Sequence, residues 1–181
     1  MTDRPEVVYR RLDRADLARL GEIDRTERIE ALYVQFGERL ERLEGDWSAR
    51  AWLEGVGEHS VGAQRAACER LLDDGAVALG AFDGSRLVGI GIVLPHLRPG
   101  LAQLAFLHVS DGYRGAGIGR RLSDDLERAA RDAGDTEIVV SATPSENTVR
   151  FYLRLAYSPM AEPLPELYEL EPEDVHMAKP L

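Results

Sequence analysis

A glycine-rich turn between a strand-like and a helix-like segment constrains the fold of this chain most. Leu101–Val109 has the length and apolar content of a strand, and Ile118–Ala133 carries an apolar stripe at helical spacing. The turn between them places glycines at 115, 117 and 119. A strand, a short turn and a helix in this order predict part of a βαβ unit with parallel strands.

The remaining segments extend this unit into a mixed sheet. The further predicted strands are Val7–Leu12, Ala76–Phe82, Arg86–Leu94, Glu137–Ala142 and Val175–Lys179. Four further helices are predicted. The first carries Leu17, Leu20 and Ile23 and is capped by Asp13 or Asp16. The others are Ile29–Leu43, Val61–Leu72 and a helix that ends near Ala156. Tyr33, Trp47 and Trp52 are expected to fill the core, with the lining of a pocket as the alternative. We expect one domain over residues 1–181, with a mixed α/β sheet between helices on both faces.

The glycine turn has the properties of a phosphate site. Glycine lets several backbone N–H groups point inward, and the first helical turn adds unpaired donors and a positive dipole end. Arg114 adds a formal charge, so the turn suits a pyrophosphate. A Walker loop is excluded because Gly119 is followed by Arg120 and Arg121. A dinucleotide fingerprint is excluded because the glycine spacing is G-x-G-x-G.

A second informative segment follows the predicted strand Glu137–Ala142. Thr143 and Glu146 have the spacing of a capping box, and Pro144 suits the first helical position. From such a start, Asn147 and Phe151 lie one turn apart on one face. Tyr152 lies on the neighbouring face. Phe151 is expected to pack under the sheet.

Together, Arg114-x-x-Gly117-x-Gly119 and the Asn147 to Tyr152 segment resemble the GNAT N-acetyltransferases over residues 76–157, with 7–23 as the usual opening strand and helix. The resemblance implies a GNAT-like fold with a partly splayed sheet and acetyl-CoA as co-substrate. It implies that Asn147 and the amides of Leu107 and Val109 bind the donor and that Tyr152 protonates the thiolate. The implied pyrophosphate loop consists of Arg114, Gly115, Ala116, Gly117, Ile118, Gly119 and Arg120.

Two departures from the family pattern concern the active site and the helix end. Gln103 occupies the position where some members carry a glutamate base, and a neutral amide cannot accept the proton. Ala156-Tyr157 replaces the usual Gly-Phe pair. The remaining candidates for the base are Asp24, Glu27, His108 and a water chain. Of these, His108 is expected to have a buried packing role. Glu27, like Glu30, is expected to be a solvated surface charge. Residues 24–60 match the region where the family builds acceptor specificity.

Composition narrows the classes of binding partner that the protein is expected to have. The net charge of −10 argues against nucleic-acid binding, and no apolar run approaches the roughly 18 residues of a membrane span. Cys68 is the only cysteine, so no disulfide or multi-cysteine metal site is expected, which fits a cytoplasmic protein. A homodimer is left open. We expect acetyl transfer to a primary amine by direct attack in a ternary complex. The alternative is an acyl-CoA-binding sensor or assembly module without turnover.

Overall fold

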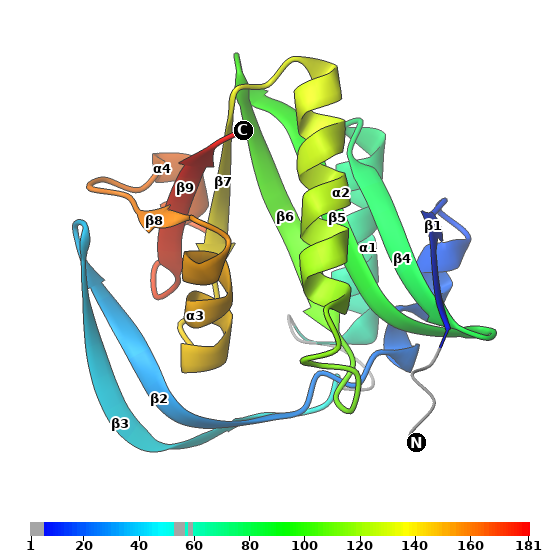
Figure 1. Ribbon diagram of the computed structural model, residues 1–181, viewed down its shortest axis with the longest axis horizontal. Coiled ribbons are helices and arrows are strands. Elements are labelled where there is room, and N and C mark those ends of the chain that lie inside the picture. Colours follow the sequence, from blue (N-terminus) through cyan, green and yellow to red (C-terminus); the bar gives the residue numbers. More distant parts are fainter. Residues whose placement is uncertain (1–5, 53–56, 58–59) are drawn as a thin grey trace.

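The computed structural model describes residues 6–52, 57 and 60–181. The main sheet has seven strands in the order β1-β4-β5-β6-β7-β9-β8 (Figure 1). Its strands are β1 (Val7–Arg11), β4 (Val77–Asp83), β5 (Arg86–Arg98), β6 (Leu101–Val109), β7 (Glu137–Ala142), β8 (Ser158–Pro159) and β9 (Val175–Pro180). Every neighbouring pair is antiparallel except β6 and β7, which are parallel. The predicted mixed α/β sheet is confirmed.

Helices cover both faces of this sheet (Figure 1). On one face α2 (Ile118–Ala133) packs over β4 and β5, and α3 (Glu146–Arg154) lies beside β7. On the other face the 3-10 helix η1 (Asp16–Glu22) and α1 (Val61–Asp73) cover a second cluster. A short α4 (Pro165–Tyr168) precedes β9. Among the described residues, no helix is both long enough and apolar enough to cross a membrane.

Close packing of α2 on β5 depends on a glycine in the strand. A Cβ added at Gly91 would lie 2.6 Å from Cδ1 of Leu126 in α2. Because real Cβ contacts are essentially never that short, a larger residue would force the Leu126 side chain to shift. Gly91 therefore allows α2 to pack closely on β5.

The predicted helix over Ile29–Leu43 is wrong, because this segment forms most of a hairpin. The strands β2 (Glu27–Phe36) and β3 (Arg39–Ala49) form a separate two-stranded sheet. Apolar spacing fits both periods here, but Gly37 adopts a φ of 59° at the turn, which ends β2. The amide of Tyr33 also donates to the carbonyl of Pro144 at 2.8 Å, so β2 gains pairing at the start of α3.

Three smaller predictions are also corrected. The first helix is the 3-10 helix η1, with the Asp13 carboxylate accepting from the amide of Asp16 at 3.0 Å. The N-cap of α3 is Ser145, whose hydroxyl accepts from the amide of Thr148, so the cap comes two residues after the expected Thr143. Trp47 is 40% exposed on β3, which among the described strands pairs with β2 alone, outside the main sheet.

Candidate active site

The site begins where β6 and β7 separate. Their parallel pairing covers only Leu101–Gln103 against Glu137–Val139. β6 continues to Val109 and β7 to Ala142, so the ends of the two strands diverge toward the glycine turn (Figure 1). In the part of the chain that the structure describes, one edge of β6 has no strand partner there.

Two backbone amides of β6 point toward this opening. The amide of Ser110 donates to the carbonyl of Val88 on β5 at 2.8 Å. Because N–H groups alternate sides along a strand, the amides of Leu107 and Val109 face away from β5. The carbonyl of Val109 agrees with this direction, since it accepts from Nε of Arg114 at 3.1 Å. The opening is therefore lined with N–H donors that β5 does not use.

In the glycine turn next to this opening, the space beside Gly115 and Gly117 is open. Gly115 and Gly117 have φ values of 77° and 88°, and a Cβ built at either would meet no atom within 4 Å. Gly117 is the N-cap of α2, and no side chain caps the first turn. The turn thus offers main-chain N–H groups at the positive end of a 16-residue helix. A pyrophosphate fits such a concavity.

Two arginines of this turn have different surroundings. The guanidinium of Arg114 is hydrogen-bonded to the main chain. Its Nε donates to the carbonyl of Val109, and its Nη1 donates to the carbonyl of Thr26 at 2.8 Å. Arg120 is exposed, and within the described part of the chain its guanidinium has no ion-pair partner. Arg120 is therefore more available than Arg114 to bind a phosphate. Arg114 instead links the turn to Thr26, which directly precedes β2.

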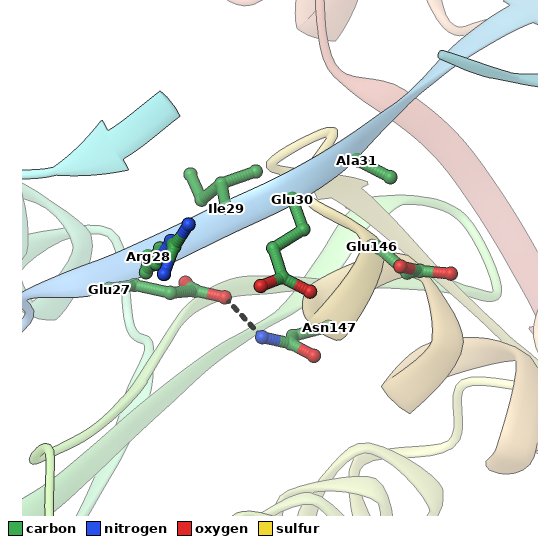
Figure 2. Close-up of a pocket in the computed structure, with 7 residues that line it drawn as sticks. All are labelled: Glu27, Arg28, Ile29, Glu30, Ala31, Glu146 and Asn147. Carbon is green, nitrogen blue, oxygen red and sulfur yellow. Dashed lines mark hydrogen bonds between the residues drawn. The ribbon is translucent and has the colours of Figure 1, made fainter. Parts of the chain in front are cut away.

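The first turn of α3 faces the start of β2. The side-chain amide of Asn147 donates to Oε1 of Glu27 at 2.7 Å, so Glu27 is not simply a solvated charge (Figure 2). A groove of about 570 Å³ runs from Asn147 to Arg114. The residues lining it are Thr26, Glu27, Arg28, Ser48, Ala49, Asp111, Arg114 and Asn147. A smaller pocket of about 80 Å³ lies beside Glu30 and Glu146 (Figure 2).

Tyr152 lies deeper, on the side of α3 that faces the core. It is 5% exposed, and its ring contacts those of Phe151 and Tyr157 at 5.1 and 5.3 Å between centroids. Burial, followed by the charge of Asp174, raises the pKa of the Tyr152 phenol. The phenol therefore stays protonated at neutral pH. Phe151 packs toward the start of α2, 3.4 Å from where a Cβ of Gly119 would be.

Two of the bases expected from the sequence, Asp24 and His108, are poorly suited to accept a proton. The carboxylate of Asp24 accepts from both the amide and the hydroxyl of Thr26, which lowers its pKa. The His108 ring packs against Trp52 and Phe106, as expected. Burial, with the charges of two nearby arginines, lowers the pKa of His108 to about 4. A group with so low a pKa is a weak base at neutral pH.

The sequence did not predict that β2 forms one wall of the groove. Thr26, Glu27 and Arg28 meet the glycine turn and α3 only through the three-dimensional fold. The one usable signal was Gly37, which lies where a turn is needed and in the middle of the expected helix.

A separated parallel strand pair beside an open glycine turn is the arrangement of an acyl-CoA-dependent transferase. A model of the acetyltransferase (GNAT) family matches residues 42–157, and the chain belongs to this family. The protein is therefore an acyltransferase, with acetyl-CoA as its co-substrate. No curated protein sequence is close enough to count as a match.

Solved structures agree on the fold. Nourseothricin acetyltransferase superposes with a TM-score of 0.72 at 14% identity, over 96% of this chain and 98% of that chain. The PaiA N-acetyltransferase from Thermoplasma acidophilum, in complex with coenzyme A, gives 0.63 at 17% identity over 97% and 99%. An aminoglycoside 6'-N-acetyltransferase complexed with coenzyme A gives 0.56 at 21% identity over 68% and 82%.

Proposed function

We propose that this protein transfers the acetyl group of acetyl-CoA to a primary amine by direct attack in a ternary complex. The observation that carries the proposal is the open glycine turn at the uncapped start of α2, next to the unpaired edge of β6. The named relatives of similar fold are N-acetyltransferases or antibiotic acetyltransferases, which supports an amine acceptor.

In the proposed complex, the main chain between Arg114 and Arg120 holds the pyrophosphate of the donor. The exposed guanidinium of Arg120 adds charge, which makes hydrogen bonds about twice as strong as neutral ones. Asn147 binds the pantetheine arm through its amide oxygen, because its nitrogen already donates to Glu27. The amides of Leu107 and Val109 bind the pantetheine arm and the acyl carbonyl.

Acetyl transfer then needs no nucleophile from the protein. The amine attacks the thioester carbon directly, and a preorganised N–H from β6 stabilises the oxyanion, worth about 3 kcal/mol. Tyr152 donates its phenolic proton to the departing thiolate. No serine, cysteine or histidine dyad is needed for this chemistry.

We propose further that residues 24–60 shape the acceptor side of the same domain. The start of β2 contributes Glu27 and Glu30, and α3 contributes Glu146 (Figure 2). Glu27 and Glu30 would attract a protonated amine before it loses its proton, whereas Glu146 is already paired with Arg42.

Two measurements test this function together. Thermal unfolding with and without acetyl-CoA should show stabilisation by the donor. Thiol release, followed with Ellman's reagent across a panel of primary amines, should show turnover with at least one of them. Stabilisation by acetyl-CoA without turnover on any amine would favour a binding module, and absence of both effects would refute the proposal.

A further inference from the structure

We propose that two copies of this protein associate through the outer edge of β3, which pairs with its own copy around a two-fold axis at Leu43. A homodimer was left open on sequence grounds, and the hairpin supplies a surface for it. The inference is independent of the proposed function, because it concerns the β2–β3 hairpin and not the binding of the donor.

β3 is the outer strand of the hairpin and lies on the far side of β2 from α3 (Figure 1). Within the described chain, β2 is its only strand partner. Nine of its eleven residues are exposed, and the other two, Leu40 and Ala49, are half-buried. A long strand edge of this kind is a template for pairing with another chain.

The main-chain groups that point out of this edge belong to alternate residues. The amide of Tyr33 donates to the carbonyl of Pro144, so it points away from β3. Arg42 lies directly opposite Tyr33, and two opposite residues of an antiparallel pair either bond each other or both point outward. The N–H and C=O of Arg42 therefore point away from β2. Because this direction repeats every second residue, Glu44 also presents its N–H and C=O to a further strand.

The side chains around Leu43 are complementary to a second copy of themselves. When a strand pairs antiparallel with its own copy around a two-fold axis, the residue on the axis faces itself. With the axis at Leu43, each Arg42 lies opposite the partner's Glu44, so two pairs of opposite charge flank the two leucines. These are also the residues whose main-chain groups point outward, so each pair can exchange backbone hydrogen bonds.

The neighbouring registers are less favourable. An axis at Arg42 places two guanidinium groups opposite each other, and an axis at Glu41 or Glu44 does the same with two carboxylates. Like charges directly opposite each other destabilise a strand pair. An axis at Leu40 would run the pairing into the turn after Phe36. Among residues 40–44, Leu43 is thus the position around which both charge and strand length suit a dimer.

The same register joins apolar side chains of the two copies. Leu43 is 48% exposed and points to the opposite face from Arg42, whose guanidinium reaches Glu146 of α3. Leu32 of β2 lies directly opposite Leu43 in the hairpin. Pairing at Leu43 would therefore align two Leu32 and two Leu43 side chains in one row across four strands, and shield part of this apolar surface from water.

The charged pairs can form without loss of the contact to α3. Nε and Nη2 of Arg42 bind Glu146, and Nη1 donates to Glu44 of the same strand at 2.8 Å. The Glu44 side chain is 83% exposed, so it can turn to the partner's Arg42. Exposed ion pairs add little affinity, so these charges select the register while the backbone and the leucines hold the copies together. β3 also lines the groove through Ser48 and Ala49, so the interface would hold that wall in both copies.

Disulfide cross-linking tests the register. Opposite residues of a pair without mutual hydrogen bonds have Cα atoms about 4.5 Å apart, which suits a disulfide. Leu43→Cys should therefore form a covalent dimer under mild oxidation about 10-fold faster or more than two controls. Phe36→Cys is on the same face and more exposed, at 53%, and Glu44→Cys is the next residue, but neither faces itself across the axis. Cys68 is buried and does not compete.

Sedimentation velocity measures association without a cross-link. Wild type should shift from the monomer toward twice the monomer mass at roughly micromolar to millimolar concentrations, as expected for a small interface. Leu43→Asp places two carboxylates on the axis and should weaken association by about 10-fold or more. Phe36→Asp lies opposite Arg39 within its own hairpin and should associate like wild type. Circular dichroism checks that both variants are folded.

A wild type that stays monomeric at the highest concentrations tested would overturn this interface, as would equal cross-linking of Leu43→Cys and Phe36→Cys. A dimer that Leu43→Asp leaves unchanged would place the contact on another surface and overturn it as well. Failure to acetylate any amine, with the dimer and its cross-link intact, would instead refute the proposed function and leave this inference standing.

Discussion

Tyr152 is one of two neighbouring phenols in the core beneath α3. Its ring lies 5.3 Å from that of Tyr157, whose hydroxyl is fully buried without a hydrogen-bond partner among the described residues. Removing either hydroxyl changes the volume of this core little. The two phenols therefore allow a comparison in which packing is nearly constant and chemistry differs.

Tyr152→Phe should lower kcat by roughly 100- to 10,000-fold, the range of a lost general acid. The dissociation constant of acetyl-CoA should change little, because the phenol is expected to act on the departing thiolate and not on the bound donor. Tyr157→Phe is the matched control and should turn over at the wild-type rate. Steady-state kinetics and calorimetry on both variants check this, and normal turnover in Tyr152→Phe would remove the phenol from the mechanism.

Asp174 should weaken the fold at alkaline pH. Its folded pKa of about 7 lies above the ordinary value of 3.8, so the native state holds this proton more tightly than the unfolded state. Stability is therefore highest below pH 4 with respect to this group, and falls as pH rises toward 7. Asp174→Asn removes this loss of stability, because the neutral amide carries no charge.

The melting temperature of Asp174→Asn should accordingly exceed that of wild type by about 4 °C or more at pH 8.5, for a cost of a few kcal/mol. The difference should shrink toward zero near pH 4. Calorimetric scans at the two pH values provide the comparison. A variant that is less stable than wild type at pH 8.5 would mean that the carboxylate is held by favourable contacts.

At the scale of the elements, the backbone of the glycine turn can be tested without removing any existing side chain. Gly117 has a φ of 88°, and the same conformation occurs at Gly75, which follows α1 and has a φ of 92°. A Cβ would meet no atom within 4 Å at either position. Alanine should thus cost about 1 kcal/mol of stability at both sites, through backbone strain alone.

Only Gly117→Ala should also weaken acetyl-CoA binding, by about 10-fold or more, because its Cβ enters the space proposed for the pyrophosphate. Gly75→Ala controls for strain and should bind the donor like wild type. Isothermal titration with acetyl-CoA on the two variants separates the effects. Equal affinities would place the pyrophosphate elsewhere.

The β2–β3 hairpin is fastened to α3 by an ion pair. Nε and Nη2 of Arg42 donate to the two carboxylate oxygens of Glu146 at 2.9 and 3.1 Å. On the same strand, Arg39 pairs with Glu41 near the tip and lies over the Phe36 ring of β2, so its interactions among the described residues stay within the hairpin. The two arginines differ in whether they anchor the hairpin.

Arg42→Gln should raise the KM for the amine by about 3- to 10-fold, because a loosened hairpin no longer fixes the acceptor side of the groove. The affinity for acetyl-CoA should stay within about twofold. Arg39→Gln, which leaves the anchor intact, should behave as wild type in both measurements. If both variants have the wild-type KM, the hairpin does not shape the acceptor site.

Local signals predicted the donor side of the site well. The bounds of β6, α2 and β7 agree with the sequence to the residue, because strand length, helical periodicity and glycine position all indicate the same structure. The prediction for the β2–β3 hairpin was wrong because the local signals there did not agree. Its apolar residues fit two periods, and pairing with Pro144, more than 100 residues away, selects the strand.

At the level of the complete fold, the site joins parts that are far apart in the chain. The Asn147–Glu27 hydrogen bond spans 120 residues, and the hydrogen bond from Arg114 to the carbonyl of Thr26 spans 88. A motif can specify main-chain groups that bind a phosphate, whereas a base depends on which charges the fold brings together.

The main-chain grip on the pyrophosphate is tested most directly by calorimetric titration of wild type with acetyl-CoA and with S-acetylpantetheine, which carries the same thioester without the nucleotide. We expect acetyl-CoA to bind about 100-fold more tightly or better, since two or more charge-assisted hydrogen bonds at 1.5 to 3 kcal/mol each, roughly, are lost with the pyrophosphate. Equal affinity for the two thioesters would contradict the proposed cradle between Arg114 and Arg120.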